Sequence, residues 1–208
     1  MINELDNMEQ GHKSGFDDSP IVDEVTPATM QVQRKLIVYI AASVDGYIAK
    51  PNDDLSFLAP VEREGEDYGY LDFISTVDTV LVGRKTYEWV MKQVSEFPHS
   101  GKQTFVITRT ARAKEGNIEF YTGDIRELVT KLKHAPGNNI FCDGGADLVN
   151  SLLQDDLVDE FILSIIPVLV GAGTRLFGDD RPEHTLKLVS IKQFESGLVQ
   201  IHYKRATN

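Results

Sequence analysis

The chain has 208 residues, of which 41% are hydrophobic and 25% are charged, and its formal net charge is −11 at pH 7. This length and composition exclude a wholly disordered or low-complexity chain and predict one ordinary domain, with or without a tail. The acidic charge disfavours a function that depends on attraction to nucleic acid or to an anionic membrane. The single cysteine, Cys142, excludes a disulfide within the chain and is typical of a reducing compartment, so we expect a cytoplasmic protein.

The first 33 residues differ from the rest of the chain. They carry seven acidic residues against one lysine, a net charge of −7 + 1 = −6, and show no periodic pattern of large apolar residues. We therefore predict an acidic, flexible tail over residues 1–33 and one folded domain over residues 34–208. The tail lacks a basic start followed by an apolar run, which argues against a secretory signal. A docking segment for a partner is the alternative to a solvated leader.

Short apolar runs alternate with segments of helical periodicity over the rest of the chain. The runs predict strands at 35–42, 79–82, 104–107, 139–142 and 160–166. The periodic segments predict helices at 68–76, 86–94, 124–134 and 146–153. The first helix is expected to bury Leu71, Ile74 and Ser75. Two further runs, 186–194 and 198–204, read as a hairpin. Together these elements predict an α/β fold with a mixed, mostly parallel sheet.

One junction between a strand and a helix combines a glycine, two cations and a hydroxyl. Ligands of α/β proteins bind beyond the carboxyl ends of the strands, where helix N-termini offer free N–H groups. The predicted strand at 79–82 is followed by Gly83, Arg84, Lys85 and Thr86, which suit a phosphate. The alternative is an ordinary helix start with surface cations, and this motif alone leaves both interpretations open.

Two later junctions carry similar signals. Thr108 and Arg109 end the next predicted strand and place a hydroxyl beside a guanidinium, either for a terminal phosphate or as a solvated pair. The run Asp143-Gly144-Gly145 lies between a strand and an apolar helix that starts near Ala146. One tight turn needs a single glycine, so paired glycines favour close approach of the backbone to a pyrophosphate.

A carboxylate follows the first predicted strand in the run Ser43-Val44-Asp45-Gly46. An Asp-Gly pair is common in plain turns. The functional alternative is a carboxylate at the carboxyl edge of the sheet that orients or protonates a substrate.

Three other site types are disfavoured. The pair Gly171-Ala172-Gly173 begins like a dinucleotide fingerprint, but Pro167 precedes it and no helix is predicted to follow. The five histidines show no ligand spacing with each other or with Cys142, so we predict no metal site. No Gly-x-Ser-x-Gly motif supports a hydrolase nucleophile.

Taken in this order, the junctions resemble the dihydrofolate reductase-like superfamily over residues 35–205. The likeness is closer to the reductase domain of bifunctional riboflavin-biosynthesis proteins and their stand-alone bacterial relatives. The matching segments are Ser43-x-Asp45-Gly46-Tyr47-Ile48-Ala49, Gly83-Arg84-Lys85-Thr86-Tyr87-Glu88, Asp143-Gly144-Gly145, Leu157-Val158-Asp159-Glu160 and Ile166 to Gly171.

The resemblance implies a three-layer α/β/α sandwich and NADPH as the cofactor. It assigns the cofactor phosphates to the first junction, the pyrophosphate to the glycine pair, the 2′-phosphate to the threonine–arginine pair, and the nicotinamide carboxamide to backbone groups of the first loop. The implied cofactor-binding residues are Ala42, Ile48, Ala49, Gly83, Arg84, Lys85, Thr86, Thr108, Arg109, Asp143, Gly144, Gly145 and Ala146. It also implies that Asp45 orients the substrate as the catalytic carboxylate.

The function implied is an NADPH-dependent reductase of a small heterocyclic or sugar-linked substrate, with 5-amino-6-(5-phosphoribosylamino)uracil as the leading named substrate. A pterin or dihydrofolate-type reductase is the enzyme alternative, although no carboxylate within 63–72 sits in a matching motif. A catalytically silent NADPH-binding protein is the alternative from another class. A zinc deaminase domain is not recognisable in the sequence. We also expect a homodimer, formed through the apolar run 161–170 and the C-terminal hairpin.

Overall fold

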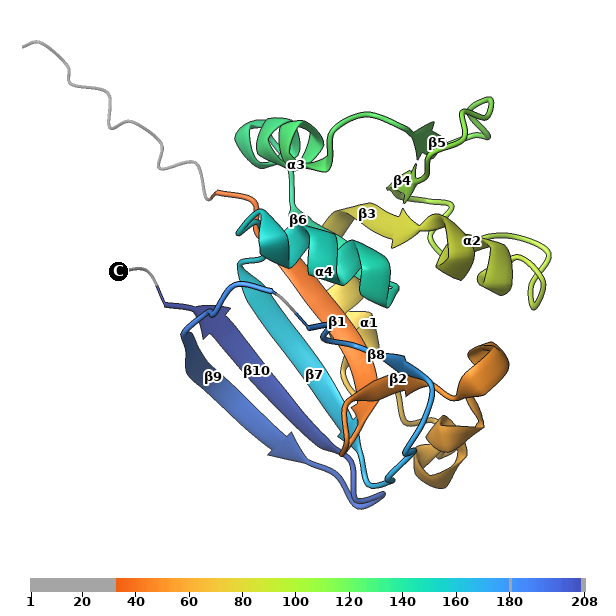
Figure 1. Cartoon of the computed structure of the whole chain (residues 1–208), viewed down its shortest axis with the longest axis vertical. Coiled ribbons are helices and arrows are strands. Elements are labelled where there is room, and N and C mark those ends of the chain that lie inside the picture. Colours follow the sequence, from red (N-terminus) through yellow and green to blue (C-terminus); the bar gives the residue numbers. More distant parts are fainter. Residues whose placement is uncertain (1–32, 180, 207–208) are drawn as a thin grey trace, which may run out of the picture. The chain divides into compact units, whose positions relative to one another are not determined.

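The computed structural model describes residues 33–179 and 181–206. Within them, the main sheet has eight strands in the order β5-β4-β3-β6-β1-β7-β10-β9 (Figure 1). The strands are β1 (Leu36–Ser43), β3 (Val77–Gly83), β4 (Gln103–Ile107), β5 (Ile118–Tyr121), β6 (Asn139–Gly144), β7 (Glu160–Ile166), β9 (Leu186–Gln193) and β10 (Val199–Arg205). All pairs from β5 to β7 are parallel, whereas β10 is antiparallel to both β7 and β9. The predicted α/β fold with a mixed, mostly parallel sheet is confirmed. The predicted tail lies outside the described residues, apart from Gln33.

Helices cover both faces of the sheet. On one face, α3 (Ile125–His134) and α4 (Ala146–Gln154) bury their apolar stripes against β1 and β6, as their spacing predicted. On the other face, α1 (Tyr70–Ser75) packs on β3 through Val80, and α2 (Arg84–Val90) packs on the same strand through Val82. Residues two apart on a strand point to one face, so α1 and α2 share a side. This arrangement is the three-layer sandwich that the resemblance implied (Figure 1).

The predicted face of α1 is wrong at Leu71 and Ser75, which are exposed, whereas Ile74 lies on the buried side. Leu71 is 67% exposed, whereas Phe73 is 8% exposed and lies against the sheet. The helix starts at Tyr70, so Tyr70, Phe73 and Ile74 share the buried side at i, i+3 and i+4. Rings stabilise this contact, because Phe73 lies edge-on to Phe141 with centroids 5.2 Å apart.

A small second sheet closes the carboxyl edge of the main one. β2 (Tyr47–Ala49) follows β1 and pairs with the distant β8 (Thr174–Arg175), which sequence periodicity did not predict. Gly173 has a φ of +137°, and a Cβ there would lie 2.0 Å from the carbonyl oxygen of Ala49. Gly173 therefore serves a close strand crossing, in agreement with the rejection of this loop as a dinucleotide fingerprint.

The segment between β2 and α1 is folded into two short 3₁₀ helices, η1 (Pro51–Asp53) and η2 (Ser56–Val61). Phe57 and Val61 of η2 are buried against Ile166 and Leu198. This packing fixes the segment beside the end of β1. No helix in the described part of the chain is long and apolar enough to cross a membrane.

Arg34 anchors the start of the folded domain. The residue is 6% exposed, and its guanidinium donates to the carbonyls of Leu132 (3.2 Å) and Asn138 (2.6 Å) and to Thr79 Oγ1 (2.7 Å). It also forms an ion pair with Asp78. One side chain thus joins the starts of β1 and β3 to the end of α3.

Candidate functional site

A cavity of about 1090 Å³ lies at the carboxyl edge of the parallel strands. Its size and position are typical of ligand sites in α/β proteins. It brings together most of the predicted site residues, namely Ile48, Ala49, Gly83, Arg84, Lys85, Thr86, Thr108, Arg109, Asp143, Gly145 and Ala146. Ala42, Asp45 and Gly144 do not line it.

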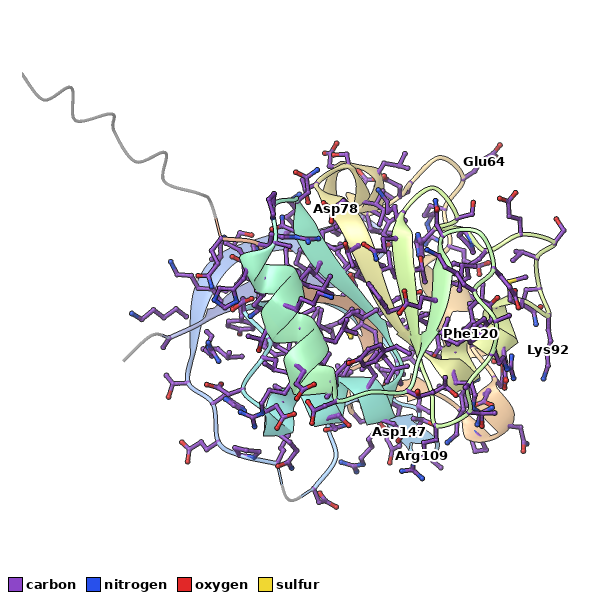
Figure 2. All side chains as sticks on the ribbon, turned by 90° about the horizontal axis from the view of Figure 1, so that it is seen from above. Glu64, Asp78, Lys92, Arg109, Phe120 and Asp147 are labelled. Atoms are coloured by element: carbon purple, nitrogen blue, oxygen red, sulfur yellow. The ribbon has the colours of Figure 1, made fainter. Side chains whose placement is uncertain are left out.

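Four cations line the cavity, and ion pairs occupy three of them. Glu88 binds both Arg84 (2.6 Å) and Arg112 (2.7 Å), and Lys85 lies 3.4 Å from Asp147. Arg109, which follows β4, is exposed and forms no ion pair or hydrogen bond with the described residues. Figure 2 shows Arg109 and Asp147 on the same side of the molecule. The guanidinium of Arg109 is therefore available to an anionic group of a ligand.

Glycines bring the starts of α2 and α4 close together. A Cβ at Gly83 would lie 3.4 Å from both the Gly144 oxygen and the Gly145 nitrogen, and one at Gly145 would lie 2.9 Å from Thr86 Oγ1. Gly144 has a φ of +91°, and the Gly144–Gly145 peptide is cis. The first turn of α4 thus opens beside that of α2 without a side chain between them. Free N–H groups at such a start suit a pyrophosphate.

Asp45 is held by a loop. Its carboxylate accepts hydrogen bonds from Ser43 Oγ (2.6 Å) and from the backbone nitrogens of Val170 (3.0 Å) and Gly171 (2.7 Å). These bonds, the one from Ser43 first, lower the pKa of Asp45 to about 2. The carboxylate therefore ties the turn after β1 to the loop that leads to β8. Its catalytic role remains a prediction.

Asp45→Asn distinguishes these roles. The nitrogens of Val170 and Gly171 donate to different oxygens of Asp45, so an asparagine keeps an acceptor for one of them and presents N–H groups to the other, and the variant should loosen the loop. Because the folded-state pKa lies below the unfolded value, the carboxylate contributes stability above pH 4 that is lost as the pH falls from 4 to 2. We expect the free energy of unfolding, measured by urea titration at several pH values, to depend less on pH in the variant than in the wild type across this interval. Unchanged pH dependence together with lost turnover would assign Asp45 to catalysis alone.

Two groups of site residues were missed by sequence reasoning. Leu55, Phe57 and Leu58 line the cavity from η2 and the residue before it, and their short, irregular segment carries no periodic signal. His99 lies behind the cavity wall, with its Nε2 3.7 Å from Asp143 Oδ2 and 3.4 Å from the Tyr70 hydroxyl. Burial and then the Asp143 charge raise the pKa of Tyr70. A lone histidine far along the chain gave no signal for this contact.

Comparisons with known proteins identify the family. The model of the RibD C-terminal domain matches residues 34–200. The uncharacterized protein YwjB of Bacillus subtilis (strain 168) is 42% identical over 176 residues, covering 84% of this chain and 100% of that protein. The uncharacterized protein YyaP of the same strain is 36% identical, covering 82% of this chain and 95% of that protein.

Solved structures show the same fold. A putative riboflavin biosynthesis protein from Shewanella sp. PV-4 matches with a TM-score of 0.77 at 28% identity, covering 83% of this chain and 99% of that one. The bifunctional deaminase and 5-amino-6-(5-phosphoribosylamino)uracil reductase of Thermotoga maritima matches with a TM-score of 0.62 at 15% identity, covering 84% of this chain and 57% of that one. The chain belongs to the RibD C-terminal domain family, a riboflavin-type reductase family, as its motifs suggested.

Proposed function

We propose that the protein is an oxidoreductase that uses NADPH to reduce a small heterocyclic or sugar-linked substrate. The observation that carries the proposal is the cavity. Arg109, which forms no ion pair or hydrogen bond with the described residues, lines it together with the adjoining starts of α2 and α4. Family membership supports the same reaction class. A binding protein would need the nucleotide site alone, whereas the cavity is also lined by the apolar residues Leu55, Phe57 and Leu58.

The residues present fit a dinucleotide phosphate. The space beside Thr86 that a Cβ on Gly145 would fill is left free for a pyrophosphate. Arg109 and Thr108 would hold the 2′-phosphate, and backbone groups of Ile48 and Ala49 would orient the nicotinamide. NADPH, when bound, would supply the hydride. The chain itself positions the two reactants and excludes water, for which the β2–β8 sheet supplies the wall.

The proposal names two candidate substrates. The phosphorylated uracil intermediate of riboflavin synthesis remains the leading named substrate, and a pterin or dihydrofolate-type compound remains the enzyme alternative. A silent NADPH-binding protein would bind the cofactor and turn over neither. Turnover therefore separates the enzyme from the binding protein, and a requirement for the substrate phosphate separates the two enzymes.

A fluorescence titration with NADPH and NADH tests the cofactor. We expect micromolar binding of NADPH and clearly weaker binding of NADH, because only NADPH carries the 2′-phosphate that Arg109 is free to contact. Loss of NADPH absorbance with added substrates then tests catalysis. Equal affinity for both nucleotides would contradict the assignment of Arg109, and no binding of either would contradict the proposed function.

We further propose a homodimer. β9 forms an edge of the main sheet and every residue of it is at least partly exposed, with Leu188 and Ile191 the most exposed apolar side chains on it. Cross-strand pairing places Ile191 beside Ile201 of β10, which in turn pairs with Leu163 of β7. An apolar row on an open sheet face is typical of a surface that associates.

A further inference from the structure

Trp89 lines the cavity with a side chain that the described residues leave without a polar or aromatic partner. It is the single tryptophan of the chain and is half-buried on α2, which follows the carboxyl end of β3 (Figure 1). No described ring or cation stacks on the indole, and its N–H has no acceptor among the described residues. Those residues leave no buried side-chain nitrogen unpaired, so this N–H is accessible. A tryptophan N–H usually has a partner when it is buried, and this one is available to a ligand.

Helical spacing places Trp89 and the arginines on different rows of α2. Glu88 is one turn after Arg84 and binds it at 2.6 Å, and the same carboxylate binds Arg112 at 2.7 Å. The row of Arg84 and Glu88 therefore faces the loop after β4, which carries Arg112. Trp89 is one turn after Lys85, and successive residues of a helix are about 100° apart around its axis, so Trp89 lies on the neighbouring row.

The row of Trp89 begins beside the start of α4. Lys85 Nζ lies 3.4 Å from Asp147 Oδ2, and a Cβ on Gly145 would lie 2.9 Å from Thr86 Oγ1. Thr86 and Lys85 precede Trp89 by three and four positions, so both are its neighbours on the helix surface. Trp89 therefore lies about one turn, or about 5.4 Å along the axis, beyond the adjoining starts of α2 and α4.

The proposed placement of the cofactor leaves this indole to the second reactant. The 2′-phosphate assigned to Arg109 is attached to the ribose that carries the adenine, so the adenine belongs beside the loop after β4, which holds Arg109 and Arg112. The pyrophosphate belongs at the adjoining starts of α2 and α4, and the nicotinamide at Ile48 and Ala49. None of these places is one turn along α2, where Trp89 lies.

We propose that Trp89 is the stacking platform for the heterocyclic ring of the substrate, with its indole N–H donating to an oxygen that the substrate carries beside that ring. The indole offers a large, flat apolar surface, and bases stack on such surfaces whatever their substituents. Stacking leaves the charged groups of the substrate, a phosphate included, to other residues. This inference rests on the proposed function, which supplies the position of the cofactor.

Uridine 5′-monophosphate and ribose 5-phosphate test the ring contact, because they share a phosphorylated ribose and differ by the ring. Saturating NADP⁺ first fills the cofactor site, so that neither probe binds at Arg109. We expect calorimetry to show that uridine 5′-monophosphate binds about fivefold to 150-fold more tightly than ribose 5-phosphate, the range for one stacked base. Because the chain has a single tryptophan, uridine 5′-monophosphate should also quench the tryptophan emission, whereas ribose 5-phosphate should not.

Two substitutions separate the ring from the rest of the side chain. Trp89→Leu should bind the two probes about equally, whereas Trp89→Phe, which keeps a ring, should retain most of the preference. Circular dichroism checks that both variants are folded, and their NADP⁺ affinity should be unchanged. Tyr203→Leu is the matched control, since Tyr203 is a half-buried aromatic residue of β10 that does not line the cavity. It should keep the full preference.

Several results would overturn the proposal: equal affinity of the wild type for both probes, no binding of uridine 5′-monophosphate at millimolar concentration, unchanged emission at saturation, or a preference that survives in Trp89→Leu. Loss of NADP⁺ affinity in a folded Trp89→Leu variant would also overturn it, because the adenine would then lie on the indole. If the wild type does not bind NADP⁺, the proposed function fails, and the two probes without nucleotide still decide whether the indole takes a ring.

Discussion

Replacing Arg109 with alanine should weaken NADPH binding about tenfold to 150-fold and leave NADH binding almost unchanged. The lost contact is a charge-assisted hydrogen bond to a phosphate, worth about 1.5–3 kcal/mol. No described residue shares the guanidinium, so its removal breaks no ion pair and costs the fold little. Nicotinamide fluorescence, titrated with both nucleotides, measures the difference.

Arg109→Lys is the matched variant. A lysine keeps the charge but loses the paired N–H groups of the guanidinium, so its NADPH affinity should lie between those of the wild type and the alanine variant. Equal losses for NADPH and NADH would show that Arg109 supports the fold of the loop after β4. A loss confined to NADH is incompatible with any 2′-phosphate role.

Replacing Arg34 with alanine should lower the free energy of unfolding by about 3 kcal/mol. The substitution leaves the carbonyl of Leu132, the hydroxyl of Thr79 and the carboxylate of Asp78 without their buried cationic donor. Asp78 is partly exposed, which keeps the cost near the lower end of the range for broken buried pairs. Urea unfolding followed by circular dichroism measures it.

Arg126→Ala provides the comparison for this loss. Arg126 also pairs with an aspartate, Asp155, but its side chain is 60% exposed, so its removal should cost less than about 1 kcal/mol. If Arg34→Ala and Arg126→Ala lower the free energy of unfolding by the same small amount, water replaces the Arg34 contacts and Arg34 does not anchor the domain. Binding of NADPH should persist in Arg34→Ala under conditions where it is folded, because Arg34 does not line the cavity.

Local periodicity predicted the parts of the fold that repeat an apolar pattern over two turns or along a buried strand. The stripe Leu148, Val149, Leu152 and Leu153 of α4 is buried as expected. The same reasoning failed for α1, because six residues are too few to show which of two possible stripes faces the sheet. β2 and β8 were not predicted, since each is held by a partner more than a hundred positions away, Tyr47 opposite Arg175.

The site was predicted unevenly for a related reason. The features predicted to bind phosphate lie within single junctions, so Gly83 to Thr86 could be recognised as a short motif, and the structure places these four residues in one cavity. The cavity wall around Asp143 is assembled from separate parts of the chain. His99 reaches Asp143 only because α1, the loop before β4 and β6 pack together through Tyr70 and Phe141. No local sequence pattern predicts a contact between residues so far apart in the chain.

The position of β1 at the centre of the sheet affects how the protein folds during synthesis. β1 is the first of the described strands to leave the ribosome, yet its neighbours are β6 and β7, with Leu36 opposite Ile140 and Ile37 opposite Glu160. Its two edges therefore stay unpaired until most of the chain has been translated. Pairings that distant slow folding. The cavity, whose wall also needs Thr174, is among the last parts to form, so a chain released early lacks the complete cavity.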